Sequence, residues 1–83
     1  KNSNQLFPNP AKDVINLKLN NQFKIENIKF TDLEGKEFKP KNIILNKKFI
    51  NFDVSNLDEG IYVIQIQTND DILKVKLIID RNN

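Results

Sequence analysis

The stretch Asn56-Leu57-Asp58-Glu59-Gly60-Ile61-Tyr62-Val63-Ile64-Gln65-Ile66 sets the architecture of this chain, because it is a turn that leads directly into the most strand-like run. Its glycine supplies a permissive backbone, and the β-branched and aromatic residues that follow fit a pleated, half-buried surface. Alternate residues from Tyr62 to Ile66 fall on one face of the expected strand. Because the intervening Ile61 and Val63 are also apolar, we expect a central strand whose first half is covered on both sides.

Composition narrows the possible functions. The chain has 83 residues, a length that fits one small domain, with 13 Lys and Arg against 11 Asp and Glu. The formal net charge of +2 gives no electrostatic support for binding nucleic acid. Cys and His are absent, which removes the usual parts of zinc sites and of serine or cysteine catalytic relays. No transmembrane or signal-peptide pattern is present, and because Met is absent too, we expect a segment of a longer protein.

The amino-terminal part reads as a linker, an edge strand and a stiff turn. Residues 1–5 are polar and are expected to be a flexible linker remnant, and Leu6-Phe7 fits a short edge strand. The prolines of Pro8-Asn9-Pro10-Ala11 withdraw two backbone donors, so we expect a stiff turn that either carries the chain across to a second sheet or is a simple loop. Residues 14–19 then alternate cleanly between apolar and polar side chains, as a half-buried strand does.

Further strands follow at intervals of about ten residues. Ile28 and Phe30 point inward in the next run, with a bulge expected near Glu26-Asn27, and residues 31–36 form a tight turn around Asp32 and Gly35. Short strands are expected at residues 37–39, within 41–48 and at 49–54. After the turn that precedes Ile61, Leu57 is expected to fold onto the core. Residues 68–71 turn the chain into a last strand at 73–79, and residues 81–83 are a polar tail. The pattern predicts an all-β domain, an antiparallel β-sandwich of six to seven short strands.

No catalytic, cofactor or metal site emerges from these residues. Acidic pairs stand at residues 32/34, 58/59 and 70/71, but none has the ligand spacing of a calcium loop, and each lies where a turn favours Asp. Lys74 and Lys76 project from the outer face of the last strand, where charge discourages edge pairing. For Tyr62 we expect a hydrogen bond from its hydroxyl to a nearby backbone carbonyl.

Four stretches resemble the C-terminal sorting domains of the type IX secretion system. In family patterns where h is apolar, these are YPNPA-x-D-x-h-x-h, h-x-h-Y-D-h-x-G-K, L-x-x-G-x-Y and K-L-h-h. They match Phe7-Pro8-Asn9-Pro10-Ala11-Lys12-Asp13-Val14-Ile15-Asn16-Leu17, Ile28-Lys29-Phe30-Thr31-Asp32-Leu33-Glu34-Gly35-Lys36, Leu57-Asp58-Glu59-Gly60-Ile61-Tyr62 and Lys76-Leu77-Ile78-Ile79, in the family's order. Phe7 stands where the family often has Tyr, and the polar end from Asp80 to Asn83 also departs from it.

The resemblance implies an immunoglobulin-like sandwich over residues 6–80 that acts as a secretion signal rather than an enzyme. It implies that an upstream cargo domain is carried through the periplasm to the cell surface or medium. The implied partners are the outer-membrane translocon, its shuttle protein and a sortase-like peptidase that removes the domain, which is expected to be a monomer. The residues that match the motifs are Pro8, Asn9, Pro10, Ala11, Leu57, Gly60, Tyr62, Lys76 and Leu77. The alternative is a non-catalytic fibronectin-like or carbohydrate-binding module of a secreted enzyme.

Overall fold

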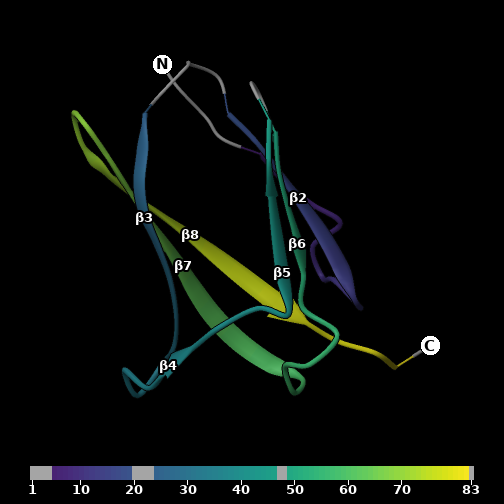
Figure 1. The fold of residues 1–83 in the computed structure, drawn as a ribbon. Coiled ribbons are helices and arrows are strands. Elements are labelled where there is room, and N and C mark those ends of the chain that lie inside the picture. The colour runs from purple at the N-terminus through teal and green to yellow at the C-terminus, as the bar shows by residue number, and fades with distance from the viewer. Residues whose placement is uncertain (1–4, 20–23, 47–48, 83) are drawn as a thin grey trace.

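The computed structural model describes residues 5–19, 24–46 and 49–82, and this part of the chain forms eight strands in two antiparallel sheets packed face to face (Figure 1). No helix occurs among the described residues, so none there could span a membrane. The strands are β1 (Gln5–Phe7), β2 (Val14–Lys18), β3 (Ile25–Asp32), β4 (Glu37–Phe38), β5 (Asn42–Leu45), β6 (Phe49–Asp53), β7 (Gly60–Thr68) and β8 (Ile72–Ile79).

The strand order confirms the immunoglobulin-like prediction. One sheet has the order β1-β2-β6-β5 and the other has β4-β3-β7-β8. With the strands lettered A, B, C, C′, D, E, F and G in chain order, the sheets are A-B-E-D and C′-C-F-G, which is the immunoglobulin-like arrangement. The described residues form eight strands, one more than the upper count of the prediction, and the two shortest, β1 and β4, have three and two residues.

The alternating apolar residues of both sheets meet in one core. Phe30 of β3 and Phe52 of β6 are both fully buried, and their rings pack edge to face across the two sheets with centroids 5.2 Å apart. The inward phase predicted for residues 14–19, 49–54 and 73–79 is confirmed. The buried apolar residues are Ala11, Ile15, Leu17, Leu19, Phe30, Ile50, Phe52, Val54, Leu57, Tyr62, Ile64, Ile66, Leu77 and Ile79.

β7 is the central strand that the sequence predicted, paired with β3 on one side and β8 on the other. The prediction that both of its faces are covered is wrong. Ile61 is 37% exposed and Val63 is only half-buried, because the domain has two layers and nothing described covers the outer face of this sheet.

The bulge predicted near Glu26-Asn27 and the turns predicted at residues 31–36 and 68–71 are confirmed. The β3–β7 register shifts between Ile25 and Asn27, which places the bulge at the expected site. Asp32 Oδ1 accepts the backbone N–H groups of Glu34 and Lys36 at 2.9 Å each, and Gly35 has φ +89°. In the β7–β8 turn, the buried Thr68 hydroxyl donates to the carbonyl of residue 71 at 3.0 Å.

The proline turn differs from its prediction. β1 and β2 flank it and pair with each other in the same sheet, so the turn does not transfer the chain to the second sheet. The chain instead touches the second sheet briefly, where Ala11 forms an isolated parallel bridge with Ile79 of β8, and then returns to the first sheet in β2. The peptide bonds before Pro8 and Pro10 are both cis.

Candidate functional site

The residues of the proline segment (residues 8–11) bind the outer edge of β8 through a side chain and through the main chain. Asn9 Nδ2 donates to the carbonyl oxygen of Lys76 at 3.2 Å, and Asn9 Oδ1 accepts the N–H of Ile78 at 3.0 Å. The Asn9 amide thus supplies one donor and one acceptor to the edge of β8, as a residue of a neighbouring strand would. The prolines on either side fix φ for this approach.

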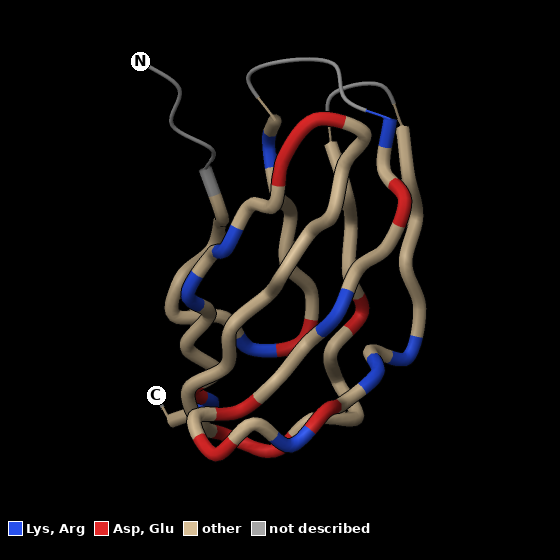
Figure 2. Tube along the Cα trace, turned by 90° about the vertical axis from the view of Figure 1, so that its left-hand side faces the viewer, with Lys and Arg blue, Asp and Glu red and all other residues tan. Residues whose placement is uncertain are grey.

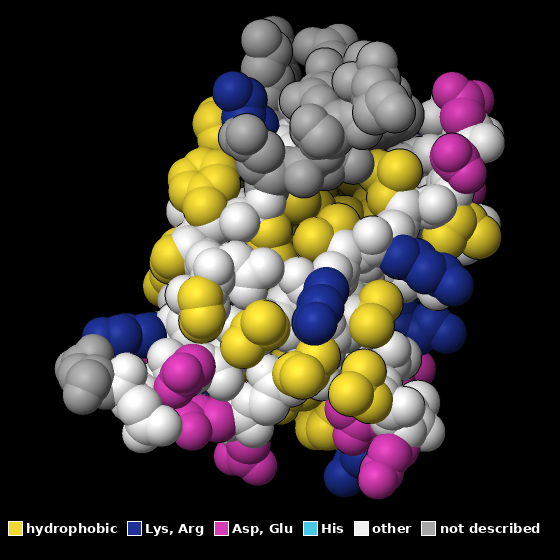
Figure 3. Space-filling view, turned by 180° about the vertical axis from the view of Figure 1, so that it is seen from behind, with side chains coloured by type: hydrophobic (Ala, Val, Ile, Leu, Met, Phe, Trp, Pro, Cys, Tyr) yellow, Lys and Arg dark blue, Asp and Glu magenta, His cyan; other side chains and the backbone are white. Residues whose placement is uncertain are grey.

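Ala11 continues the same contact with its own main chain. Its N–H donates to the carbonyl of Ile78 at 2.7 Å, and its carbonyl accepts the N–H of Asp80 at 2.9 Å. The Ala11 side chain is completely buried and belongs to the core. The proline segment therefore covers the edge of β8 from Lys76 to Asp80 and closes this side of the sandwich, which faces the viewer in Figure 3.

Residues 57–62 form a tyrosine corner, a feature in which a Tyr hydroxyl binds the backbone a few residues upstream. Tyr62 is 3% exposed, and its hydroxyl donates to the carbonyl of Asp58 at 2.7 Å, which confirms the predicted bond. The Tyr62 ring meets Phe38 edge to face at 5.3 Å. Burial, followed by the nearby Asp58 carboxylate, raises the pKa of the Tyr62 hydroxyl above 10.0, because both disfavour the phenolate.

Leu57 and Gly60 hold the corner in shape. Leu57 is buried, as predicted, and its N–H donates to the carbonyl of Val54 at 2.9 Å. Gly60 has φ +153°, a conformation that residues with a Cβ rarely adopt. A Cβ built there would lie 3.9 Å from the Tyr62 ring, which is ordinary contact, so the backbone alone requires glycine.

Sheet register brings these motifs side by side. Gly60 pairs with Ile79 and Tyr62 with Leu77 in the β7–β8 ladder, and Ala11 bridges to the same Ile79. We call the resulting region the motif junction. It consists of the proline segment (residues 8–11), the tyrosine corner (57–62) and the end of β8 with the two residues after it (76–81).

Arg81 links the end of β8 to the tyrosine corner and to Asp13, which lies two residues beyond the proline segment, and no sequence pattern revealed it. Its Nε lies 3.0 Å from Asp13 Oδ1, while Nη1 donates to the carbonyl of Leu57 at 2.7 Å and Nη2 to that of Val54 at 3.1 Å. Its backbone N–H donates to Glu59 Oε2 at 3.0 Å. Arg81 was assigned to the polar tail because it follows the last alternating strand, and its distance in sequence from Asp13 and Leu57 hides these contacts.

The junction offers structural contacts rather than reactive groups. Among the described residues, no group of three acidic, His or Cys side chains is arranged to hold a metal ion. The nine residues that match the motifs divide into two classes. Four are buried (Ala11, Leu57, Tyr62 and Leu77), and five are exposed (Pro8, Asn9, Pro10, Gly60 and Lys76).

Comparison with known proteins gives one family. The model of a family described as the secretion system C-terminal sorting domain matches residues 5–80 of the chain. No curated protein matches the chain.

Proposed function

Because the chain belongs to the family of type IX secretion system C-terminal sorting domains, we propose that the motif junction is the part of the signal that the secretion machinery recognises. The domain is a C-terminal sorting signal for type IX secretion. This role implies that it interacts with the secretion machinery and that it directs export to the cell surface or the extracellular space. The family is defined by sorting rather than by catalysis.

One observation carries the proposal: the matching residues, spread from position 8 to position 77, are assembled by the fold at one place. The Asn9 amide binds the Lys76 carbonyl and the Ile78 N–H, and Arg81 bonds to the Leu57 carbonyl. A recognition site assembled in this way exists only in the folded domain. The machinery therefore reads a shape and not a linear peptide.

Burial assigns different roles to the matching residues. Ala11, Leu57, Tyr62 and Leu77 are buried, so a partner cannot touch them and they act by holding the surface in place. Pro8, Asn9, Pro10 and Lys76 are exposed on that surface and are the residues that a partner contacts directly. This division supports recognition by the outer-membrane translocon and its shuttle protein, after the cargo has entered the periplasm.

The same proposal covers the fate of the signal. Of the predicted linker at residues 1–5, Gln5 is the first residue of β1 and pairs with Lys18, and residues 1–4 lie outside the described residues. We propose that residues 1–4 link the domain to an upstream cargo and that a sortase-like peptidase removes the domain, a monomer, during export. Mass spectrometry of an exported cargo tests this step. We expect a product that lacks the domain, and an exported product that still carries residues 5–80 contradicts removal.

The junction itself is tested by export of a reporter fused before residues 1–83 in a cell with a working type IX system. We expect the wild-type fusion at the surface or in the medium, and a reporter that stays in the periplasm contradicts the function. Asn9→Ala removes both amide bonds to β8, so we expect export to fall several-fold. Gln67→Ala truncates an exposed amide on β7 outside the junction and is the matched control. Equal export of the two variants contradicts a role for the junction.

A further inference from the structure

The four sheet edges of this domain are protected unequally. β4 has two residues, and β1 has three and leads into Pro8, so neither offers a long edge. β8 carries Lys74 and Lys76 and is covered at its end by the proline segment. β5 has the sequence Asn-Ile-Ile-Leu, without charge or proline, and all four residues are exposed. An edge without such protection is available for pairing with another strand.

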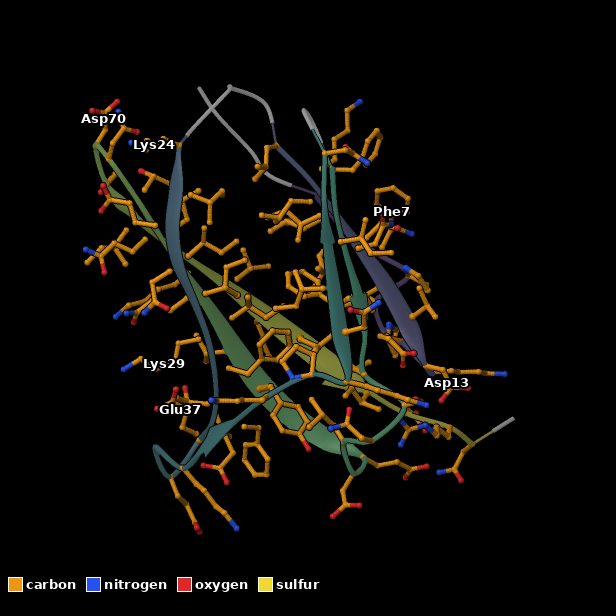
Figure 4. The ribbon with its side chains drawn as sticks, in the orientation of Figure 1. Phe7, Asp13, Lys24, Lys29, Glu37 and Asp70 are labelled. Carbon is orange, nitrogen blue, oxygen red and sulfur yellow. The ribbon has the colours of Figure 1, made fainter. Side chains whose placement is uncertain are left out.

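An apolar groove runs beside this edge, between β5 of one sheet and β3 of the other. Its volume is about 380 Å³, and it is lined by Ile25, Glu26, Asn27, Ile28, Ile43 and Leu45. Ile43 and Leu45 pair with the buried Phe52 and Ile50, so they occupy inward positions, yet they are 36% and 56% exposed. Figure 4 shows β3 and β5 facing each other across the front of the molecule. Figure 2, seen from the side, places them opposite the amino-terminal strand.

The residues of β5 whose side chains face this groove also have main-chain groups at the open edge of the sheet. The N–H of Asn46 donates to the carbonyl of Phe49 at 3.0 Å, which fixes the alternation of the antiparallel ladder. By that alternation Ile44 turns its N–H and C=O toward β6, while Ile43 and Leu45 turn theirs toward the open edge. The two residues that face the groove are therefore the two that present free main-chain groups, and no described strand pairs with them.

A second hollow lies on the other face of β5. Its volume is about 210 Å³, and Val14, Asn42, Ile44, Asn51, Phe52 and Asp53 line it. Ile44 is 55% exposed there. A strand added beyond β5 would thus find apolar surface on both faces, with its alternate side chains entering the groove and lying beside Ile44.

The size of the edge decides between two possible occupants. A stable homodimer buries roughly 1,200–2,000 Å² in total, and two four-residue strands that pair side by side cover only a small part of that area. An extended segment needs less, because it gains main-chain hydrogen bonds along the edge and inserts side chains into the groove. The edge therefore suits an extended segment better than a second copy of the domain.

We propose that β5 and its groove receive an extended segment of the secretion machinery, with apolar side chains at alternate positions, by strand addition. The proposal rests on the proposed function and adds a second contact surface. This surface lies on the side of the sandwich opposite the proline segment. Glu26 is the charged residue in the groove lining, so the segment carries no acidic residue at that end.

Leu45→Lys tests the proposal, since it places a charge at the edge and in the groove while the side chain remains unbranched at Cβ. We expect export of the reporter fusion to fall about tenfold or more relative to wild type, with Tm of the isolated domain changed by less than about 4 °C. Leu33→Lys is the matched control, because Leu33 is 70% exposed in the β3–β4 turn and lies outside the groove. Leu45→Ile keeps the apolar strand-forming character and should keep full export.

The outcomes separate this inference from the proposed function. A wild-type fusion that is not exported refutes the sorting function, and with it this proposal. A wild-type fusion that is exported as well as its Leu45→Lys variant refutes the strand-addition site alone. Sedimentation of the isolated domain addresses the other occupant. A monomer supports an extended segment, whereas a wild-type dimer that Leu45→Lys dissociates identifies a second copy as the occupant and overturns the proposal.

Direct binding is measured with the peptide acetyl-Thr-Val-Thr-Ile-Thr-Val-amide, titrated into the isotope-labelled domain and followed by amide chemical shifts. We expect shifts at residues 25–28 and 42–46 that disappear in Leu45→Lys. Shifts confined to another edge, or shifts that the substitution leaves in place, count against strand addition at β5.

Discussion

Replacing Arg81 by Met should unfold the motif junction more readily while leaving the aliphatic stem of the side chain in place. Arg81 donates to the Leu57 and Val54 carbonyls and to the Asp13 carboxylate. A hydrogen bond from a charged donor contributes roughly 1.5–3 kcal/mol when it is well buried, but the Arg81 side chain is 28% exposed. The Val54 carbonyl also keeps the N–H of Leu57 as a donor. We therefore assign about 1 kcal/mol to each carbonyl bond.

The ion pair with Asp13 adds little, about 0.5 kcal/mol or less, because the Asp13 side chain is 61% exposed. The total loss is about 2 kcal/mol, which lowers Tm of a domain of this size by roughly 8–16 °C. Urea unfolding followed by circular dichroism measures the loss of free energy, and thermal unfolding measures the fall in Tm. Lys74→Met removes an exposed cation from β8 and is the control, with an expected change within about 0.5 kcal/mol. If Arg81→Met is as stable as that control, Arg81 does not hold the junction together.

Three further predictions concern the residues around the junction and their titration. Gly60→Ala should cost about 1–3 kcal/mol in urea unfolding, because φ +153° strains any residue with a Cβ, and an unchanged midpoint would show that the turn relaxes freely. Tyr62→Phe should lose about 1 kcal/mol at neutral pH with the bond to the Asp58 carbonyl. Since the folded pKa of Tyr62 is raised, its contribution is complete below pH 10.0 and declines as the pH rises through the folded pKa, so Tm of the wild type should fall more steeply above pH 10.0 than Tm of Tyr62→Phe. The pKa of Asp53 is lowered, chiefly by the hydrogen bond from the Ser55 hydroxyl, so its contribution is present above pH 3.8 and is lost as the pH falls through the folded pKa. Asp53→Asn should flatten that acid limb, and parallel acid limbs would argue against it.

The motif Leu57-x-x-Gly60-x-Tyr62 has a structural explanation in every position. Leu57 is buried, Gly60 has positive φ, and Tyr62 binds the backbone of the turn between them. A tyrosine corner is a general device of immunoglobulin-like sandwiches, so this motif alone marks a fold and not a sorting signal. What distinguishes this domain is the combination with the proline segment, whose Asn9 and Ala11 attach to β8 beside the corner.

Local alternation made most of the fold predictable. Residues 14–19, 49–54 and 73–79 each carry an apolar set with a period of two, and each forms a strand with that set inward. Two other features could be predicted from local sequence alone. The phase slip before Ile28 predicted the bulge, and Asp32 with Gly35 predicted the β3–β4 turn.

The errors arose where burial depends on distant parts of the chain. The apolar Ile61 and Val63 indicated a strand covered on both faces. The sequence of one strand does not show whether a third layer covers its outer face. The same holds for β5, where alternation predicted a strand and could not show that its apolar residues remain exposed. Arg81 lies beyond the last alternating residue, and its partners stand 22 to 68 positions away, so no local pattern could reveal it.

The central claim is that export depends on the assembled junction and not only on a stable fold. The most direct test plots reporter export against the free energy of unfolding for variants inside and outside the junction. Asn9→Ala removes two exposed hydrogen bonds, and Ile66→Val trims a buried side chain of β7 outside the junction, so both should lose about 1 kcal/mol. We predict that Asn9→Ala is exported several-fold less than Ile66→Val at equal stability. If both variants fall on a single line of export against stability, the machinery requires only a folded domain, and the claim is contradicted.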